Sequence, residues 1–132
     1  MPFCILIVDD SATTRGLIKR VINLAQLGDC EIREAPDGKA ALDLLHEFHV
    51  DLVLADLHMP EMTGVELAHA MFGHPNLRAI PVVIVSAEPS AERIAALRNA
   101  GVKGYLRKPC SPESLRDLIA PFVEVHHGKC AP

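Results

Sequence analysis

Apolar and polar positions along the chain follow two alternating patterns. Five short runs predict strands. The first is continuously apolar and rich in β-branched residues, which is typical of a buried strand, whereas the second alternates and is expected near the sheet edge. These runs span 3–8, 31–35, 52–55, 82–85 and 104–106. Each run is followed by a longer segment whose apolar residues recur every three or four positions, as expected for an amphipathic helix. Five strands alternating with five helices imply an α/β domain whose parallel strands are joined by right-handed crossovers.

Capping and breaking residues indicate where the helices begin and end. Ser11 can cap the first helix, and Gly28 can end it. Ser90 can cap the fourth helix, and Gly101 can stop it. Pro121 predicts a kink or a local break in the fifth helix, because proline lacks the backbone N–H. The residues expected to face inward from the first two helices are Leu17, Ile18, Val21, Ile22, Ala25, Ala41, Leu42, Leu44, Leu45 and Phe48.

Length and charge restrict the class of protein. The 132 residues fit one domain, expected at 1–125, followed by a polar tail at 126–132 that we expect to be flexible. The net charge of −4 argues against direct nucleic-acid binding, because contacts to phosphates require clustered Lys and Arg. No signal-peptide pattern occurs, and no apolar run approaches the ~18 residues of a membrane span. We therefore expect a cytoplasmic protein without membrane insertion, whose four cysteines are free thiols.

Carboxylates and an amine stand at the C-terminal ends of the expected strands. Asp9 and Asp10 follow the first strand, Asp56 follows the third, and Lys108 follows the fifth. The C-terminal ends of adjacent parallel strands meet at one edge of a sheet, where open α/β sheets bind ligands. Three neighbouring carboxylates repel one another unless a cation intervenes. Oxygen ligands suit Mg²⁺, and Mn²⁺ could substitute for it.

Such a group of residues is suited to phosphoryl transfer. One carboxylate could attack phosphorus and form an aspartyl phosphate. The metal and the Lys108 ammonium would neutralise charge on the phosphoryl oxygens. Ser86, which follows the fourth strand, could donate a hydrogen bond to the same group.

These features resemble the receiver domain of two-component response regulators over residues 3–125. The motifs that carry the resemblance are Asp9-Asp10, Asp56, Met59-Pro60-Glu61-Met62-Thr63-Gly64, Ser86-Ala87, Tyr105 and Lys108-Pro109. The resemblance implies a flavodoxin-like, doubly wound, five-stranded parallel sheet in the order 2-1-3-4-5 with five helices. Ala87-Glu88 after Ser86 is similar to stand-alone chemotaxis regulators. The Met1 start and a tail that does not read as a linker favour a single-domain regulator over a receiver excised from a longer chain.

The same resemblance implies roles for individual residues. Asp56 would be the phosphorylation site, and Asp10 would bind Mg²⁺ directly while Asp9 binds it mainly through water. Asp56 and the backbone carbonyl of His58 would complete the protein ligands. The side chains of His58 and Glu88 would overhang the phosphoryl group and affect its hydrolysis.

Two residues would link phosphorylation to a change of shape. Ser86 and Lys108 would contact the phosphoryl group, and the Lys108-Pro109 peptide would be cis, which proline makes inexpensive. Ser86 would move toward the new charge and free space that Tyr105 can fill. The surface of the fourth helix, fifth strand and fifth helix would then change for an output protein.

The implied function is a phosphorylation-dependent signalling switch of a two-component phosphorelay. A sensor histidine kinase or a histidine phosphotransfer protein would donate the phosphoryl group from phosphohistidine. The domain would not be an enzyme on other substrates and would catalyse only its own phosphorylation and dephosphorylation. The alternative is an aspartate-nucleophile phosphohydrolase, which often has a second Asp where this chain has His58. A flavodoxin-like cofactor binder is disfavoured, because the loops lack a Ser/Thr/Gly-rich phosphate cradle.

Overall fold

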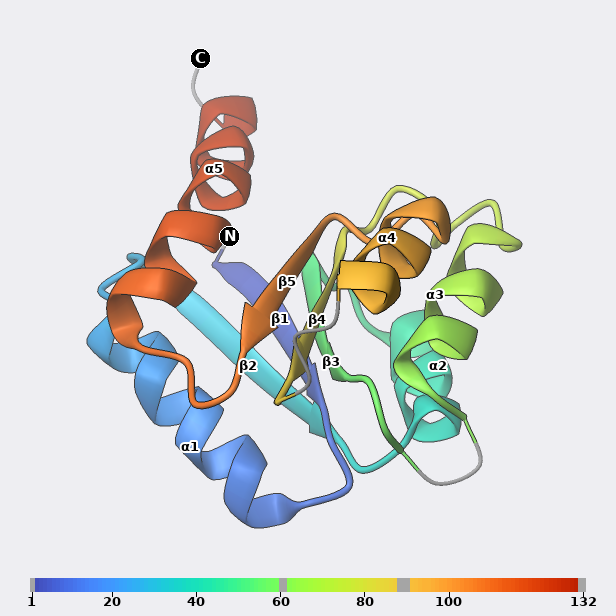
Figure 1. The fold of residues 1–132 in the computed structure, drawn as a ribbon. Helices are drawn as coiled ribbons and strands as arrows, with labels where there is room; N and C mark the ends of the chain where they lie inside the picture. Colours follow the sequence, from blue (N-terminus) through green and yellow to red (C-terminus); the bar gives the residue numbers. More distant parts are fainter. Residues whose placement is uncertain (1, 60–61, 88–90, 131–132) are drawn as a thin grey trace.

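The five strands of the protein form one parallel sheet in the order β2-β1-β3-β4-β5 (Figure 1). This computed structural model describes residues 2–59, 62–87 and 91–130. The strands are β1 (Phe3–Val8), β2 (Cys30–Ala35), β3 (Leu52–Asp56), β4 (Val82–Ser86) and β5 (Gly104–Arg107). The expected strands, their parallel pairing and their order are confirmed, with boundaries that differ by one residue at most.

Helices cover both faces of the sheet (Figure 1). They are α1 (Ala12–Leu24), α2 (Gly38–Glu47), α3 (Gly64–Phe72), α4 (Ala91–Asn99) and α5 (Pro112–Cys130). Helices α1 and α5 lie on one face, and α2, α3 and α4 lie on the other. None of the helices in the described ranges combines the length and apolarity needed to cross a membrane.

Alternate residues of the central strands enter two separate apolar cores. Ile5 and Leu54 pack on the side of α1 and α5, whereas Leu6 and Val53 pack on the side of α2 and α3. Because both faces are covered, the central strands are apolar at nearly every position, and this produces the continuous runs in the sequence.

Side chains in the loops set the starts of the first two helices. The backbone N–H of Thr14 donates to Oγ of Ser11 at 3.2 Å, so the expected cap of α1 is confirmed. The N–H of Ala40 donates to Oδ1 of Asp37 at 2.8 Å and caps α2 in the same way. The cap expected at Ser90 lies outside the described residues.

Helix α1 differs from expectation at its end and on one face. It stops at Leu24, before Gly28, because Gln26 enters the left-handed region with a φ of 53° and the helix cannot continue there. Leu17 is 59% exposed, so its expected inward position is wrong. Its neighbour Ile18 faces the sheet instead, and adjacent helical residues point about 100° apart.

Phe48 also departs from its expected place in the core, because it is 39% exposed. It is the C-cap of α2 and has an extended backbone with a φ of −125° and a ψ of 148°, so it leaves the inward face of the helix. The guanidinium group of Arg33 lies 3.8 Å from the centroid of its ring, which gives the ring a cation–π partner in place of core neighbours.

Helix α5 continues through Pro121 to Cys130, so a local break does not occur, and residues 126–130 are helical. The alternative expectation, a kink at Pro121, stays a prediction. Pro121 removes one backbone donor, but Ile119 and Val123 on either side of it are buried and hold the helix against the sheet. The last two residues lie outside the described part of the chain. The flexibility of the tail stays a prediction.

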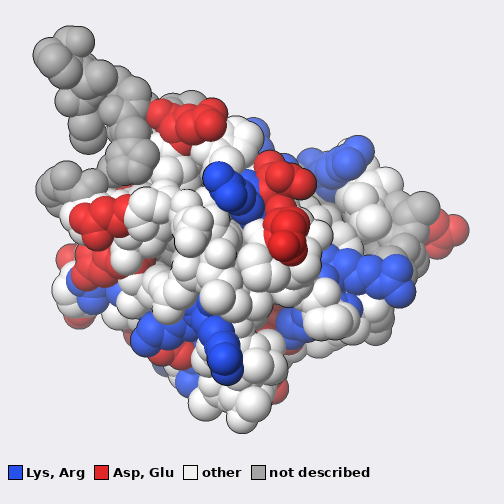
Figure 2. All heavy atoms as spheres, turned by 90° about the vertical axis from the view of Figure 1, so that its left-hand side faces the viewer, with Lys and Arg blue, Asp and Glu red and all other residues white. Residues whose placement is uncertain are grey.

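Charges of both signs are spread over the side of the molecule that carries α1 and α5. Figure 2 shows Lys and Arg interspersed with Asp and Glu on that side, without a continuous basic field. This distribution agrees with the net charge of −4 and does not suit phosphate-backbone binding on this face.

Candidate functional site

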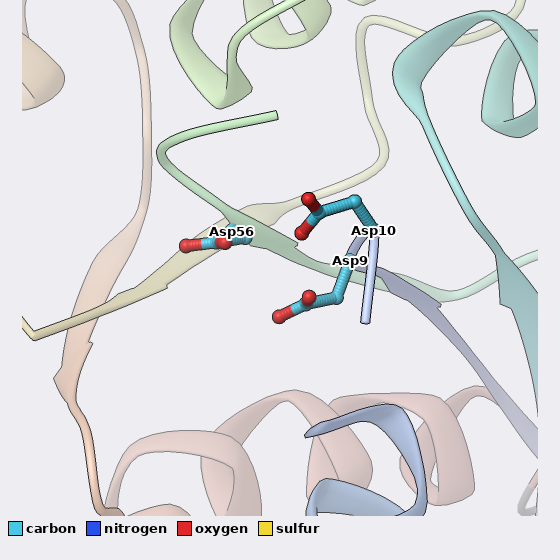
Figure 3. Close-up of side chains that lie close together, drawn as sticks. All are labelled: Asp9, Asp10 and Asp56. Carbon is cyan, nitrogen blue, oxygen red and sulfur yellow. The ribbon is translucent and has the colours of Figure 1, made fainter. Parts of the chain in front are cut away.

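Four neighbouring strands bring the candidate residues to one edge of the sheet. Asp9 follows β1, Asp56 ends β3, Ser86 ends β4 and Lys108 follows β5. Ligand oxygens of Asp9, Asp10 and Asp56 all lie within 4.8 Å of one another (Figure 3). This edge is the C-terminal end of the parallel strands, where the topology of such sheets leaves room for a ligand.

Asp9 is buried and fully engaged. Its Oδ1 accepts the backbone N–H of Ser11 at 2.9 Å, and its Oδ2 accepts Nζ of Lys108 at 3.0 Å. Its own N–H donates to the carbonyl of Ala35 at 3.1 Å. Asp10, in contrast, is exposed, and within the described ranges its carboxylate has no hydrogen bond or ion pair. Asp10 is therefore the carboxylate that is most available to a cation.

Asp56 is a partly buried carboxylate that lies between a cation and another acid. Its side chain is 14% exposed, and burial raises the pKa of this carboxyl above its ordinary value. The Lys108 ammonium, 3.6 Å from Oδ1, lowers the pKa, whereas the charge of Asp9 raises it. The backbone N–H groups of Leu57 and His58 also lower it. A cation at this edge would add to the groups that keep Asp56 ionised.

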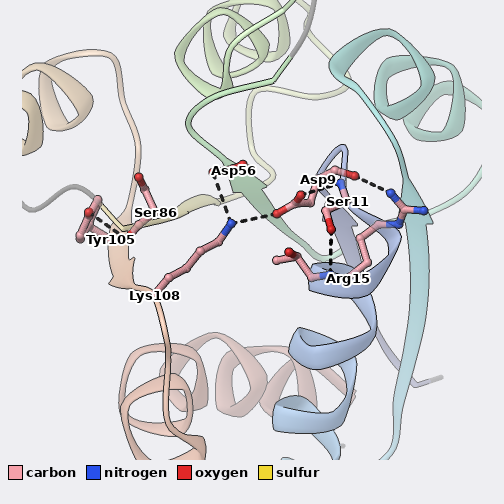
Figure 4. A network of polar contacts seen from close by, with 8 residues as sticks. Asp9, Ser11, Arg15, Asp56, Ser86, Tyr105 and Lys108 are labelled. Carbon is pink, nitrogen blue, oxygen red and sulfur yellow. Dashed lines mark hydrogen bonds and ion pairs between the residues drawn. The ribbon is translucent and has the colours of Figure 1, made fainter.

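Lys108 is held by its backbone and points into the acidic cluster. The Lys108-Pro109 peptide is cis, as expected. The N–H of Lys108 donates to the carbonyl of Ser86 at 2.9 Å, which ties the end of β5 to the end of β4. The ammonium thus lies between the carboxylate that follows β1 and the carboxylate that ends β3 (Figure 4).

Ser86 and Tyr105 are connected through the backbone of Ser86. The phenol of the half-buried Tyr105 donates to the carbonyl of Ser86 at 3.1 Å (Figure 4). Ser86 itself is only 2% exposed. The same carbonyl therefore receives hydrogen bonds from both Tyr105 and Lys108, so a displacement of Ser86 would alter both.

Some of the expected site residues lie outside the described part of the chain or away from the acidic cluster's buried side. The side chain of His58 is exposed, whereas Glu88 lies outside the described residues. Of the loop 59–64, positions 60 and 61 also lie outside them. Gly64 closes this loop against the site: a Cβ there would lie 2.5 Å from the backbone oxygen of Asp56, so only glycine fits without a shift.

Arg15 is a site neighbour that sequence reasoning missed. Its guanidinium group donates from Nη1 to the carbonyl of Asp9 and from Nε to Oε1 of Glu34 at 3.1 Å. No motif marks either residue. The position of Glu34 near the end of an edge strand was the one available signal, and it requires the β1–β2 register to be known.

The donor set fits a hard divalent cation. Three carboxylates supply oxygen ligands, and the single Lys108 ammonium neutralises only part of their charge. Mg²⁺ prefers one or two carboxylates and retained water, which an exposed Asp10 beside the half-buried Asp56 can provide. The grouping of these acids is the arrangement that receiver domains typically use for Mg²⁺.

Comparison with known proteins identifies the family. Residues 5–120 match the model of the response regulator receiver domain. The chain is 39% identical over 124 residues to the chemotaxis protein CheY of Pseudomonas aeruginosa, covering 94% of this chain and 98% of the relative. It is 36% identical over 120 residues to CheY-3 of Vibrio cholerae, covering 91% of each.

Solved structures agree with the sequence relatives. The fold matches CheY4 of Vibrio cholerae with a TM-score of 0.83 and 28% identity, over 92% of this chain and 99% of that one. It matches a putative response regulator of Chloroflexus aurantiacus with a TM-score of 0.85 and 27% identity, over 94% and 99%. The flavodoxin-like architecture and the family resemblance are thereby confirmed, and the chain belongs to the response regulator receiver domains of two-component signalling.

Proposed function

We propose that this receiver domain switches state when Asp56 accepts a phosphoryl group from phosphohistidine. The observation that carries the proposal is the position of the Asp56 carboxylate, 3.6 Å from the Lys108 ammonium and within 4.8 Å of the acidic pair Asp9 and Asp10. A nucleophilic carboxylate, a fixed cation and spare oxygen ligands are what phosphoryl transfer to aspartate requires.

The metal ligands would come from the acids grouped at this edge of the sheet and from one backbone carbonyl. Asp10 and Asp56 would bind Mg²⁺ directly, Asp9 would reach it mainly through water, and the backbone carbonyl of His58 would complete the set. The engagement of both Asp9 oxygens supports this division. Bound Mg²⁺ would supply positive charge for the phosphoryl oxygens, and Mn²⁺ could replace it.

In the transfer step, an Oδ atom of Asp56 attacks phosphorus while the phosphorus–nitrogen bond to the donor imidazole breaks. The Lys108 ammonium and the Ser86 hydroxyl would contact the phosphoryl oxygens. Hydrolysis of the aspartyl phosphate would return the domain to its first state, with His58 and Glu88 affecting the rate. The domain would thus act only on itself, using a donor that is a sensor histidine kinase or a histidine phosphotransfer protein.

Tyr105 would transmit the change to a partner. Phosphorylation adds a charge of about −1.5 to −2 that needs new donors, and the Ser86 hydroxyl is the neutral donor nearest to it along the strand ends. Movement of Ser86 would break the bond from the Tyr105 phenol to its carbonyl. The surface of α4, β5 and α5 would then change for a downstream output protein in the cytoplasm.

The phosphohydrolase alternative has less support. An exposed His58 stands where such an enzyme often has its second aspartate, and the relatives at 36–39% identity are chemotaxis proteins.

Acetyl phosphate and Mg²⁺ test the proposal directly. Intact mass spectrometry should detect the addition of one phosphoryl group, and Asp56→Asn should abolish the addition. Asp43→Asn is the matched control, because Asp43 is exposed on α2 and should remain without effect. Equal labelling of Asp56→Asn and the unchanged protein would overturn the assignment.

A further inference from the structure

Arg15 lies beside the acidic edge, but its guanidinium group donates to the backbone carbonyl of Asp9 rather than to the carboxylates of Asp9 and Asp56 (Figure 4). Its side chain is 15% exposed, and it joins the carbonyl of Asp9 to the carboxylate of Glu34. We propose that Arg15 is a positioning residue, anchored by Glu34, that holds the loop of Asp10 in the geometry required for divalent-metal binding. This inference rests on the proposed Mg²⁺ site.

The loop depends on Asp9 for its shape. Each polar group of Asp9 has a partner: the N–H pairs with Ala35, the carbonyl with Arg15, and the two carboxylate oxygens with Ser11 and Lys108. Asp9 is 2% exposed, so in this structure its carbonyl has little contact with water and depends on the hydrogen bond from Arg15. The loss of that bond would free one side of the loop.

The loop from Asp9 to Ser11 sets the position of Asp10. Its carboxylate has no side-chain partner in the described ranges, so contacts of its own do not hold it near Asp56. The distance between the two carboxylates is set by the backbone between Asp9 and the cap of α1. Ligands that are placed in advance bind a metal more tightly, because less conformational freedom is lost on binding.

Glu34 anchors the Arg15 side chain to strand β2 of the sheet. It lies on β2 beside Ile7 of β1, one step before the strands end. Its Oε1 accepts Nε of Arg15, and its Oε2 lies 4.0 Å from Nζ of Lys19. The planar guanidinium group can reach the carbonyl and the carboxylate together, whereas a lysine has one point charge and cannot reproduce that fork.

Replacing Arg15 changes both the charge near the site and the position of the loop, and these two changes have opposite effects on Mg²⁺ affinity. Removing a cation beside three carboxylates would by itself strengthen Mg²⁺ binding. Releasing the loop would weaken it, and loss of residues that orient metal ligands typically costs 10–100-fold in affinity. We expect the positional effect to dominate, so that Arg15→Met binds Mg²⁺ about tenfold more weakly.

Isothermal titration of Mg²⁺ into four proteins separates these effects. The proteins are the unchanged chain, Arg15→Met, Arg15→Lys and Lys19→Met. Lys19→Met removes the same charge from the same helix, but the 49%-exposed Lys19 side chain contacts Glu34 and not Asp9. Both Arg15 variants should bind more weakly, including Arg15→Lys, which keeps its charge, and Lys19→Met should stay within about twofold of the unchanged chain.

A second readout needs no metal. Amide hydrogen exchange of Asp10 and Ser11 in the metal-free protein should be faster in Arg15→Met than in Lys19→Met. If Arg15→Met does not fold, Arg15→Lys carries the same comparison. Equal or tighter Mg²⁺ binding by the Arg15 variants, or unchanged exchange at the loop, would overturn the inference. If the unchanged chain itself binds no Mg²⁺, the proposed metal site fails, and the exchange data still decide whether Arg15 holds the loop.

Discussion

Replacing Lys108 with Met removes the ammonium group that lies 3.0 Å from Asp9 and 3.6 Å from Asp56 while keeping an unbranched side chain. Asp9 is 2% exposed, so in the unchanged structure little water contacts its carboxylate and Lys108 is the partner of Oδ2. A hydrogen bond to a charged group contributes about 1.5–3 kcal/mol, and the three carboxylates would also repel one another with less compensation. We therefore expect the metal-free variant to lose about 2–3 kcal/mol of unfolding free energy at neutral pH.

Mg²⁺ should reverse this loss. The cation and the ammonium group compete for the same carboxylates, so Lys108→Met should bind Mg²⁺ more tightly than the unchanged protein does. A ligand that binds only the folded state adds about 2.7 kcal/mol at 100 times its Kd, which is close to the expected loss. The variant should therefore gain more stability from Mg²⁺ than the unchanged protein gains, although its phosphorylation should be slower.

Urea denaturation followed by circular dichroism, with and without Mg²⁺, measures both effects. Lys103→Met is the control, because its exposed side chain precedes β5 and its N–H pairs with Val82, at the opposite edge of the sheet. The reasoning would be refuted by a metal-free Lys108→Met that is as stable as the Lys103→Met control. If Mg²⁺ raises the unfolding free energy of Lys108→Met by the same amount as that of the unchanged protein, the competition between ammonium and metal is refuted.

Three further predictions address Asp56 and Gly64 at the site, and Asp51 just before β3 at the opposite edge of the sheet. Burial raises the pKa of Asp56, so at a pH above the ordinary titration range of a carboxyl group its ionised form lowers the free energy of unfolding. Asp56→Asn should therefore stabilise the metal-free protein at neutral pH. Denaturation at several pH values should show that this gain vanishes as the pH falls below that range. Asp51→Ala removes the acceptor of the Cys4 N–H at 2.8 Å and should cost about 1–3 kcal/mol in urea denaturation, whereas removing the 69%-exposed His49 should cost much less. Gly64→Ala places a Cβ 2.5 Å from the Asp56 carbonyl oxygen, so thermal unfolding should occur at a lower temperature and labelling by acetyl phosphate should be slower.

The strands and the site could be predicted because they depend on short stretches of sequence. Residues of β3 from Leu52 to Ala55 are all buried, so the run is apolar without interruption and easily recognised. Parallel strands then bring their C-terminal ends to one edge, so Asp9, Asp56 and Lys108 could be expected to meet before the side chains were seen.

Features that depend on how elements pack were harder to predict. Leu17 satisfies the helical spacing, but the rotation of α1 on the sheet buries Ile18 instead. Phe48 fits the apolar face of α2 until the helix ends at that residue and the chain becomes extended. Pro121 has the local property of a helix breaker, yet buried neighbours on both sides keep α5 continuous. For Leu17 and Pro121, packing against the sheet outweighed a local preference, whereas for Phe48 the end of α2 decided the outcome.

The support behind Asp10 was hidden for the same reason. Arg15 and Glu34 are nineteen residues apart and become partners only because β2 pairs in parallel with β1. Through them the edge strand holds the carbonyl of Asp9, whereas Lys108, from the far side of β3 and β4, holds its carboxylate. With Asp9 held from both sides, its neighbour Asp10 needs no partner of its own. Under the proposal, Asp10 presents a positioned carboxylate that has no hydrogen bond or ion pair among the described residues, and it stays available as an oxygen ligand for a cation.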